Sequence, residues 1–205
     1  MNRLILARHA ESTNNVIAHE RIGGRSNHVG LTPRGERQAR LLGQHLRTLK
    51  HIDTVYCSPA KRTRRTLELA LSQTDLSHDI TFDDGLQEVS QGEAEGGLRS
   101  VFWTPERSRQ AEQEGMDFRM PGGESLRESG LRMIKSLAVI SEKHPEETVL
   151  IGTHGLAIRC LVGMIKGWSK HDIVSTPTPN CSLTLLSSRD NQLHVDDFAK
   201  VVINE

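Results

Sequence analysis

Aromatic side chains, cysteines and long apolar runs are all scarce in this chain of 205 residues. Phe, Trp and Tyr together make up only 3% of it, so we do not expect a surface that stacks nucleic-acid bases. The three cysteines are too few for a disulfide framework, and their number is odd. No apolar run approaches the ~20 residues of a membrane-spanning helix. We therefore expect reduced thiols, a cytoplasmic location and no membrane partner.

An excess of charge of either sign is also missing. The 26 Lys and Arg residues balance the 26 Asp and Glu residues, so the formal net charge is zero. Proteins that bind nucleic acids broadly carry a basic excess, and we therefore expect no nucleic-acid partner. Hydrophobic residues form 36% and charged residues 25% of the chain, which is typical of a globular protein. The sequence carries no signal of an oligomeric state.

Segments with the periodicity of strands alternate with segments that have the periodicity of helices. Strands are predicted at 3–7, 53–57, 80–82, 148–152, 180–187 and 194–202, the last two around a turn at 189–191. Helices are predicted at 33–49, from 58–59 onward, at 124–144 and at 155–165. Thr32 followed by Pro33 is a typical helix start, with a capping side chain and a proline in the first turn. The alternation predicts an α/β fold with a largely parallel sheet.

The segment 89–123 breaks this alternation. It is rich in glycine and proline, with one weak helical stretch near 106–114. We interpret it as an excursion that covers the core like a cap, within a single domain that spans residues 1–205.

Side chains suited to binding an anion follow three of the predicted strands. Arg8 and His9 follow the first strand, Arg62 lies one helical turn beyond the second, and His154 follows the strand at 148–152. Ligands of open α/β sheets bind beyond the carboxyl ends of the strands, so we expect these side chains to converge. Glu88, after the turn that ends the short strand at 80–82, is expected at the same rim.

This set of side chains predicts chemistry on a phosphoryl group. Two guanidinium groups form a permanently charged site for an oxyanion, and the helix that begins at Gly155 would add its first amides. Adjacent positive charge would keep an imidazole neutral, and a neutral imidazole is a competent nucleophile toward phosphorus. One carboxyl group would protonate the leaving oxygen. Neither a metal nor a cofactor is required, because arginines neutralise the phosphoryl oxygens.

Six short motifs occur along the whole chain: RHAES at 8–12, LTPRG at 31–35, YCSPAKR at 56–62, LQE at 86–88, PGGES at 121–125 and THG at 153–155. Together they resemble the motifs of the histidine phosphatase superfamily, the phosphoglycerate mutase-like proteins. Two positions depart from that pattern. Ala10 stands where glycine is usual, and Ala94 stands where many members have a tryptophan.

The resemblance implies a fold and a set of roles. The fold is a three-layer α/β/α sandwich with a mostly parallel central sheet. His9 would be the nucleophile that becomes phosphorylated, and Glu88 would act first as acid and then as base for water. The residues implied to bind the phosphoryl group are Arg8, Arg62, His154 and Asn15.

We predict metal-independent hydrolysis of a small phosphorylated metabolite, through a phosphohistidine intermediate. Phosphoglycerate mutase-type transfer is one alternative, and it would require extra basic groups for a second acidic end of the substrate. A non-catalytic module that binds a phosphorylated ligand is the other, although such relatives usually lose the nucleophile or the acid.

Further basic residues are candidates for substrate contact. Arg21 and Arg25 flank the glycine pair at 23–24 and are the better candidates. The arginines of the excursion are interleaved with glutamates, a pattern that favours a solvated helix face; they are Arg99, Arg107, Arg109 and Arg119.

Overall fold

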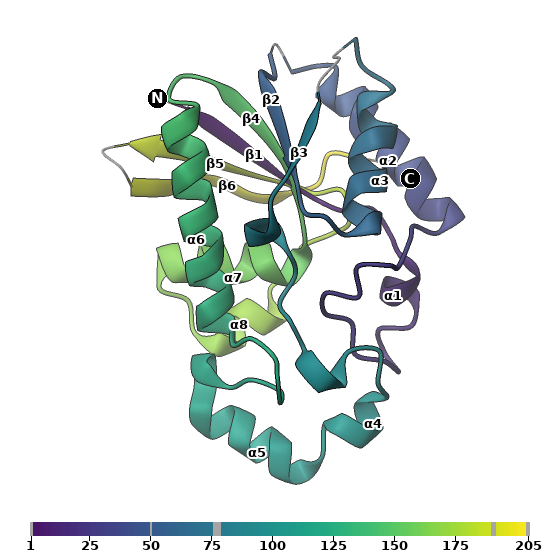
Figure 1. Cartoon of the computed structure of the whole chain (residues 1–205), viewed down its shortest axis with the longest axis vertical. Helices are drawn as coiled ribbons and strands as arrows, with labels where there is room; N and C mark the ends of the chain where they lie inside the picture. The colour runs from purple at the N-terminus through teal and green to yellow at the C-terminus, as the bar shows by residue number, and fades with distance from the viewer. Residues whose placement is uncertain (1, 50, 76–78, 190–191, 204–205) are drawn as a thin grey trace.

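The computed structural model describes residues 2–49, 51–75, 79–189 and 192–203. Within this part of the chain one sheet has the strand order β3-β2-β4-β1-β5-β6 (Figure 1). The strands are β1 (Arg3–Arg8), β2 (Thr54–Cys57), β3 (Ile80–Phe82), β4 (Thr148–Thr153), β5 (Leu183–Arg189) and β6 (Gln192–Lys200). The first four run parallel, and β5 and β6 extend the sheet in antiparallel pairs. The predicted, largely parallel sheet is confirmed.

Helices cover both faces of this sheet, with α2 and α3 on one side and α6 and α7 on the other (Figure 1). They are α2 (Pro33–Leu46), α3 (Lys61–Leu71), α6 (Leu126–Lys143) and α7 (Gly155–Lys166). Each face has its own apolar cluster. Neighbouring side chains of a strand point to opposite faces, so Ile5 packs into one cluster and Leu6 into the other. The three-layer α/β/α arrangement is therefore confirmed.

The predicted start of α2 is observed, whereas α3 begins later than predicted. The Thr32 hydroxyl accepts a hydrogen bond from the amide of Gly35, and Pro33 is the first residue of α2. Helix α3 begins at Lys61, after an extended N-cap residue. Ser58 stays in the preceding turn, where its hydroxyl bonds to the imidazole of His154.

The last two strands are also shifted from their predicted positions. Strand β5 begins at Leu183, because Cys181 has a φ of 58°, in the left-handed region, which makes the pairing with β1 irregular. The amide of Cys181 still donates to the carbonyl oxygen of Arg8. Strand β6 runs from Gln192 to Lys200. Of the turn predicted between them, residues 190–191 lie outside the described part of the chain.

The excursion at 89–123 lies beyond one end of the sheet, at the bottom of Figure 1. The elements of the excursion are η2 (Gly92–Ala94), α4 (Arg99–Phe102), α5 (Pro105–Glu114) and η3 (Gly115–Asp117). The helix predicted at 106–114 is confirmed as α5. The sequence did not predict α4, α1 (Thr13–Val16), α8 (Lys170–Ser175) or η1 (Asp84–Leu86), which are too short to show a period. The excursion packs through its own apolar cluster, in which Ala94 and Met120 meet Ile22 and the rings of Phe102, Trp103 and Phe118.

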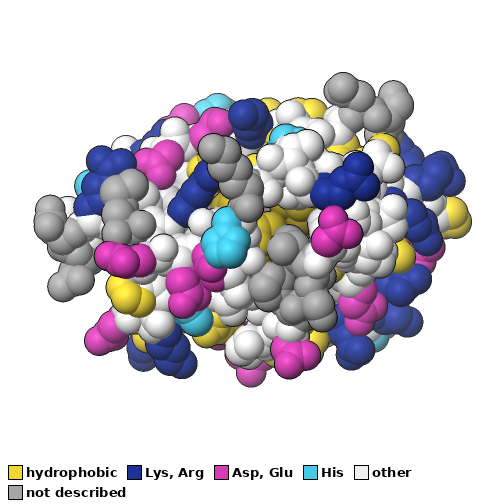
Figure 2. Space-filling view, turned by 90° about the horizontal axis from the view of Figure 1, so that it is seen from above, with side chains coloured by type: hydrophobic (Ala, Val, Ile, Leu, Met, Phe, Trp, Pro, Cys, Tyr) yellow, Lys and Arg dark blue, Asp and Glu magenta, His cyan; other side chains and the backbone are white. Residues whose placement is uncertain are grey.

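The opposite end of the molecule carries charged side chains of both signs, interspersed around an apolar hollow (Figure 2). This face shows no field of one sign, in keeping with the balanced composition. None of the described helices is long and apolar enough to cross a membrane.

Candidate active site

The carboxyl ends of the central strands bring the predicted residues to one edge of the sheet. Arg8 ends β1 and His9 follows it, while His154 follows β4 as the N-cap of α7. Arg62 lies in the first turn of α3, which follows β2. Strand β4 pairs with both β1 and β2, and this arrangement places the three strand ends side by side. Glu88, beyond η1, joins them through the first turn of α7.

The imidazole of His9 is fixed in one tautomer. The Nε of Arg62 donates to Nε2 of His9 over 3.3 Å. A guanidinium group can only donate, so Nε2 carries the lone pair and the ring proton is on Nδ1. That proton is donated to the carbonyl oxygen of Ala10 over 2.7 Å. Ala10 has a negative φ, so the turn accepts alanine where the family usually has glycine.

His154 is fixed in the opposite tautomer by the same arginine. Nη2 of Arg62 donates to Nδ1 of His154 over 3.1 Å, and Nε2 of His154 therefore donates to the hydroxyl of Ser58 over 2.7 Å. The two imidazole rings meet edge to face, with centroids 5.2 Å apart. One guanidinium group thus orients both histidines.

Burial and positive charge act on both imidazoles in the same direction. The pKa of His9 lies well below its usual value, first because the ring is buried and then because Arg62 and Arg8 are close. The pKa of His154 is lowered by burial, then by Arg62, His9 and Arg8. Both rings are therefore neutral at neutral pH, and His9 keeps its lone pair.

Arg62 is a buried cation held by main-chain carbonyl groups. Its Nη1 donates to the carbonyl oxygens of Arg25 (2.9 Å) and Ser26 (3.1 Å), and Nη2 donates to that of Gly24 (3.1 Å). Burial lowers its pKa, while Glu88 and Glu95 raise it. Because the pKa of a free arginine lies far above neutral pH, the group stays charged.

Arg8 is the second cation, and it is partly buried. Its Nη1 donates to the carbonyl oxygen of Thr178, and its buried Nε makes no hydrogen bond within the described residues. Gly155 packs directly against it, because a Cβ at that position would lie 2.9 Å from the Nε of Arg8. The guanidinium group therefore retains a donor, and the glycine leaves room for it.

The carboxylate of Glu88 occupies the first amides of α7. Its Oε1 accepts from the amides of Ala157 (2.8 Å) and Val89 (3.0 Å), and its Oε2 accepts from the amide of Leu156 (3.2 Å). The first amides of this helix were expected to bind an oxyanion, but those of Leu156 and Ala157 already bind Glu88. A contact between Gly155 and substrate stays a prediction.

Asn15 is connected to His9 through a residue that the sequence analysis missed. The amide of Asn180 donates to the carbonyl oxygen of His9 (2.9 Å) and to Oδ1 of Asn15 (3.2 Å). The same Oδ1 accepts from the amide of Ser12 as part of a helix cap. Asn180 was predicted to begin a strand at 180–187, but it lies in the turn before β5, so its contact with His9 was not expected.

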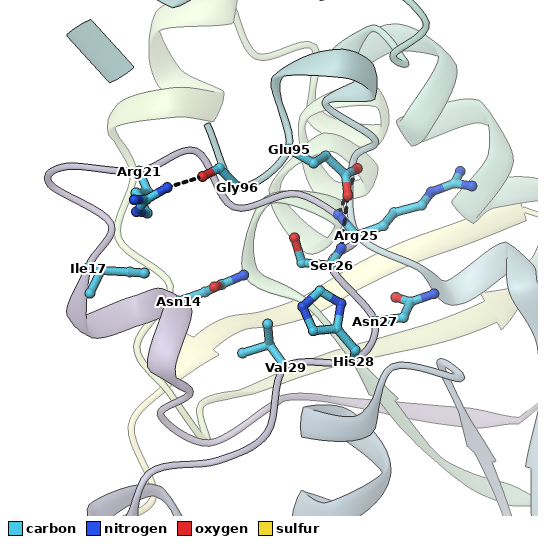
Figure 3. A pocket seen from close by; sticks show the side chains of 10 residues that line it. All are labelled: Asn14, Ile17, Arg21, Arg25, Ser26, Asn27, His28, Val29, Glu95 and Gly96. Carbon is cyan, nitrogen blue, oxygen red and sulfur yellow. Dashed lines mark hydrogen bonds between the residues drawn. The ribbon is translucent and has the colours of Figure 1, made fainter. Parts of the chain in front are cut away.

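Arg21 is not brought together with this cluster. It is exposed, and its Nη1 donates to the carbonyl oxygen of Gly96 over 2.7 Å. It lines a separate cavity of about 450 Å³ between α1 and the loop at 25–29 (Figure 3). A second cavity, of about 490 Å³, lies beside Glu88 and is bordered by Gly24, Trp103 and Arg159.

Comparisons with known proteins identify the family. The family model for the histidine phosphatase superfamily (branch 1) matches residues 4–200. This chain belongs to the histidine phosphatase superfamily. A superfamily member of Salmonella choleraesuis (strain SC-B67), named probable phosphoglycerate mutase GpmB, is 33% identical over 197 residues, which are 94% of this chain and 87% of that protein.

Solved structures match the fold of this histidine phosphatase along its length. YhfR of Bacillus stearothermophilus is 25% identical, with a TM-score of 0.84 and 98% of both chains covered. A mycobacterial glucosyl-3-phosphoglycerate phosphatase, Rv2419c, has a TM-score of 0.81 at 21% identity, covering 97% of this chain and 99% of that one. The family that the motifs predicted is thus confirmed, and so is its α/β/α fold.

Proposed function

We propose that this histidine phosphatase hydrolyses small phosphomonoesters without a metal, through a phosphohistidine on His9. The observation that carries this proposal is the fixed Nδ1–H tautomer of a neutral His9, with the Nε2 lone pair on the guanidinium side. We assign it to the cytoplasm as one domain of 205 residues, with 89–123 as its cap.

In the first half of the proposed reaction, Nε2 of His9 attacks phosphorus and forms an N–P bond. The P–O bond to the alcohol breaks, and the leaving oxygen takes a proton from Glu88. The positive charges of Arg8 and Arg62 stabilise the negative charge of the phosphoryl oxygens, while the hydrogen bonds of Arg62 hold His9 and His154 beside them. The buried Nε of Arg8 is the donor best placed to bind these oxygens, because it makes no hydrogen bond within the described residues.

Glu88 has one carboxylate oxygen better suited to proton transfer than the other. Oε1 accepts two amides, whereas Oε2 accepts one, over 3.2 Å, so we assign the proton to Oε2. The alcohol part of the substrate would lie in the adjoining cavity, beside Trp103. In the second half, Glu88 accepts a proton from water, the oxygen of water attacks phosphorus, the N–P bond breaks and phosphate leaves.

Phosphoglycerate mutase-type transfer is the second candidate, because the GpmB relative carries that name. The basic groups of the excursion favour hydrolysis instead. Arg109 and Arg119 pair with Glu106 and Glu128, and Arg107 donates to the carbonyl oxygen of Phe102, so these three are already engaged. Of the four arginines in the excursion, Arg99 lines the cavity beside Glu88, and the other three do not.

The test uses a chromogenic aryl phosphate and 3-phosphoglycerate, each with and without EDTA. We expect phosphate release that survives chelation, with an acid-labile and base-stable phosphoryl group trapped on His9 after a rapid quench. Isomerisation of 3-phosphoglycerate faster than phosphate release would favour the mutase. Binding of orthovanadate with no turnover of any phosphomonoester would favour a non-catalytic module, and loss of activity on chelation would overturn the metal-free mechanism.

A further inference from the structure

The segment Gly24, Arg25 and Ser26 lies between a buried cation and a carboxylate. On one side its three carbonyl oxygens accept hydrogen bonds from the guanidinium group of Arg62. On the other side the amides of Arg25 and Ser26 donate to the carboxylate of Glu95, the residue that follows η2. The position of Arg62 therefore depends on how this irregular segment is held.

Glu95 supplies the hydrogen bonds that hold it. Oε1 accepts from the amide of Arg25 (3.1 Å), and Oε2 accepts from the amide of Ser26 (2.9 Å). Figure 3 shows this carboxylate facing the two amides, while the side chain of Arg25 extends away. Oε1 also accepts from the amide of Gln91 (3.1 Å) and the hydroxyl of Ser90 (3.4 Å). One carboxylate thus ties the loop to the base of the excursion.

The backbone of the loop requires such a restraint. Gly24 has a φ of 90°, and Ser26 has a φ of 26°, a conformation that non-glycine residues rarely adopt. Gly24 also lies so close to Glu95 that a Cβ would be 2.9 Å from its Oε1. Successive main-chain amides that converge on one anion stabilise this kind of backbone. Without the carboxylate, the three carbonyl oxygens would lose the arrangement that fits one guanidinium group.

We propose that Glu95 is a positioning residue for phosphoryl transfer, which holds Arg62 against His9 and His154 through the loop 24–26. Glu95 touches neither imidazole and acts through main-chain atoms of that loop. The inference rests on the proposed function, because it assumes that Arg62 serves a phosphoryl pocket. It assigns a task to the one carboxylate that lines the cavity of Figure 3.

The first measurement is the affinity for orthovanadate, determined by titration calorimetry. It compares the wild type with Glu95→Gln and with a matched control, Glu93→Gln. Glu93 is an exposed carboxylate of η2, two residues before Glu95. We expect Glu95→Gln to weaken binding about 10- to 100-fold, as a misplaced binding group does, and Glu93→Gln to leave it within about twofold. In an Arg62→Lys background, Glu95→Gln should weaken orthovanadate binding little further. Lysine lacks the planar guanidinium group whose several N–H donors bind the loop carbonyl oxygens.

The second measurement is the pH profile of kcat/KM. The groups that face His9 are Arg62 from α3, Arg8 from β1 and His154 at the start of α7. If Arg62 moves away, less positive charge acts on His9, its pKa rises, and the acid limb of the profile moves to higher pH. We expect that shift in Glu95→Gln and not in Glu93→Gln. The milder Glu95→Asp variant serves the same test if Glu95→Gln does not fold.

The outcomes separate this inference from the proposed function. No orthovanadate binding by the wild type would overturn the phosphoryl pocket itself. Tight binding by the wild type with an unchanged Glu95→Gln would overturn the role of Glu95 alone. Equal losses in the wild-type and Arg62→Lys backgrounds, with an unmoved acid limb, would also overturn it, because Glu95 would then stabilise the fold without acting through Arg62.

Discussion

Arginine side chains are held in two different ways in the pocket and in the excursion. In the pocket, Arg8 donates to a main-chain carbonyl oxygen, and Arg62 donates to main-chain carbonyl oxygens and to two imidazole nitrogens. In the excursion, Arg109 and Arg119 pair with carboxylates over 3.2 and 2.7 Å. A carbonyl group satisfies the N–H donors but leaves the positive charge in place, whereas a carboxylate neutralises it. Charge available to a substrate is therefore concentrated in the pocket.

Burial separates the two groups further. Arg62 is 2% exposed, whereas the side chains of Arg109 and Arg119 are 67% and 53% exposed. Exposed ion pairs contribute about 0–1 kcal/mol to stability and are screened by salt. A buried guanidinium group acts through a medium that screens it far less. The same residue type therefore has a large functional effect in one region and a small one in the other.

The largest expected effect is at the nucleophile that the pocket arginines surround. His9→Ala removes the nitrogen that would form the N–P bond, so turnover and the trapped phosphoryl adduct should both disappear. Rapid-quench labelling and steady-state phosphate release measure the two quantities. Turnover that persists in this variant would show that another group attacks phosphorus.

The second-largest loss of activity should follow removal of the Arg62 guanidinium group. Arg62→Ala removes a positive charge beside the phosphoryl oxygens and the hydrogen bonds that hold both imidazoles, so kcat should fall about 10²- to 10³-fold, as when one oxyanion-hole donor is lost. The pKa of His9 should also rise, because Arg62 lowers it, and the acid limb of kcat/KM should move to higher pH. A large loss of kcat without that movement would argue that Arg62 does not act on His9.

The effect on the rate of removing the Glu88 carboxyl group should depend on the leaving group of the substrate. Glu88→Gln should slow phosphoryl transfer from alkyl phosphates by on the order of 100-fold, because their leaving oxygen needs a proton. Aryl phosphates need less protonation, so they should give a burst of phenol followed by slow hydrolysis of the adduct. Stopped-flow measurements distinguish the two phases. Equal slowing of alkyl and aryl substrates would exclude Glu88 as the acid.

A smaller effect is expected where the backbone makes room for Arg8. Gly155→Ala places a Cβ 2.9 Å from the Nε of Arg8, so the guanidinium group must shift. We expect kcat/KM to fall about tenfold, in line with the loss of about one hydrogen bond to a charged group. Thermal unfolding of the same variant is the control. An unchanged kcat/KM would mean that the free donor of Arg8 is not used.

The smallest effect is expected in the excursion. Arg109→Ala and Arg119→Ala each remove an exposed ion pair, so stability should change by less than about 0.5 kcal/mol and kcat/KM by less than about twofold. Denaturant unfolding and steady-state kinetics measure both. A tenfold rise in KM for either variant would abolish the contrast between the two regions and would favour a second anionic subsite, as a mutase requires.

The part of the site that follows strand ends could be predicted from the sequence. Parallel strands end at one edge, and this rule placed Arg8, His9 and His154 together before any contact was known. Contacts between side chains and irregular main chain could not be predicted. Glu95 accepts hydrogen bonds from two main-chain amides, and Asn180 donates one to the carbonyl oxygen of His9. Every residue type has such main-chain groups, so the sequence does not indicate which of them a side chain will contact.

Helix and strand boundaries could likewise be predicted where a side chain sets them, but not where the main-chain conformation does. The start of α2 has a side-chain signal in Thr32 and Pro33 and was predicted correctly. The start of β5 is set by the left-handed backbone of Cys181, which no residue type announces. Arg21 was expected near the substrate because it is close in sequence to the motif, but its guanidinium group is held by Gly96 instead.

The position of β4 between β1 and β2 has a consequence for the newly made chain. Both neighbours of β4 are synthesised long before it, and the hydrogen bond between Asn180 and His9 spans 171 residues. A nascent chain that carries Arg8, His9 and Arg62 but not yet β4 has no His154 beside them and no Asn180 to hold the backbone of His9. Contacts so distant in sequence form late and slowly during folding. The pocket therefore stays unassembled until β4 and Asn180 have left the ribosome, long after Arg8, His9 and Arg62.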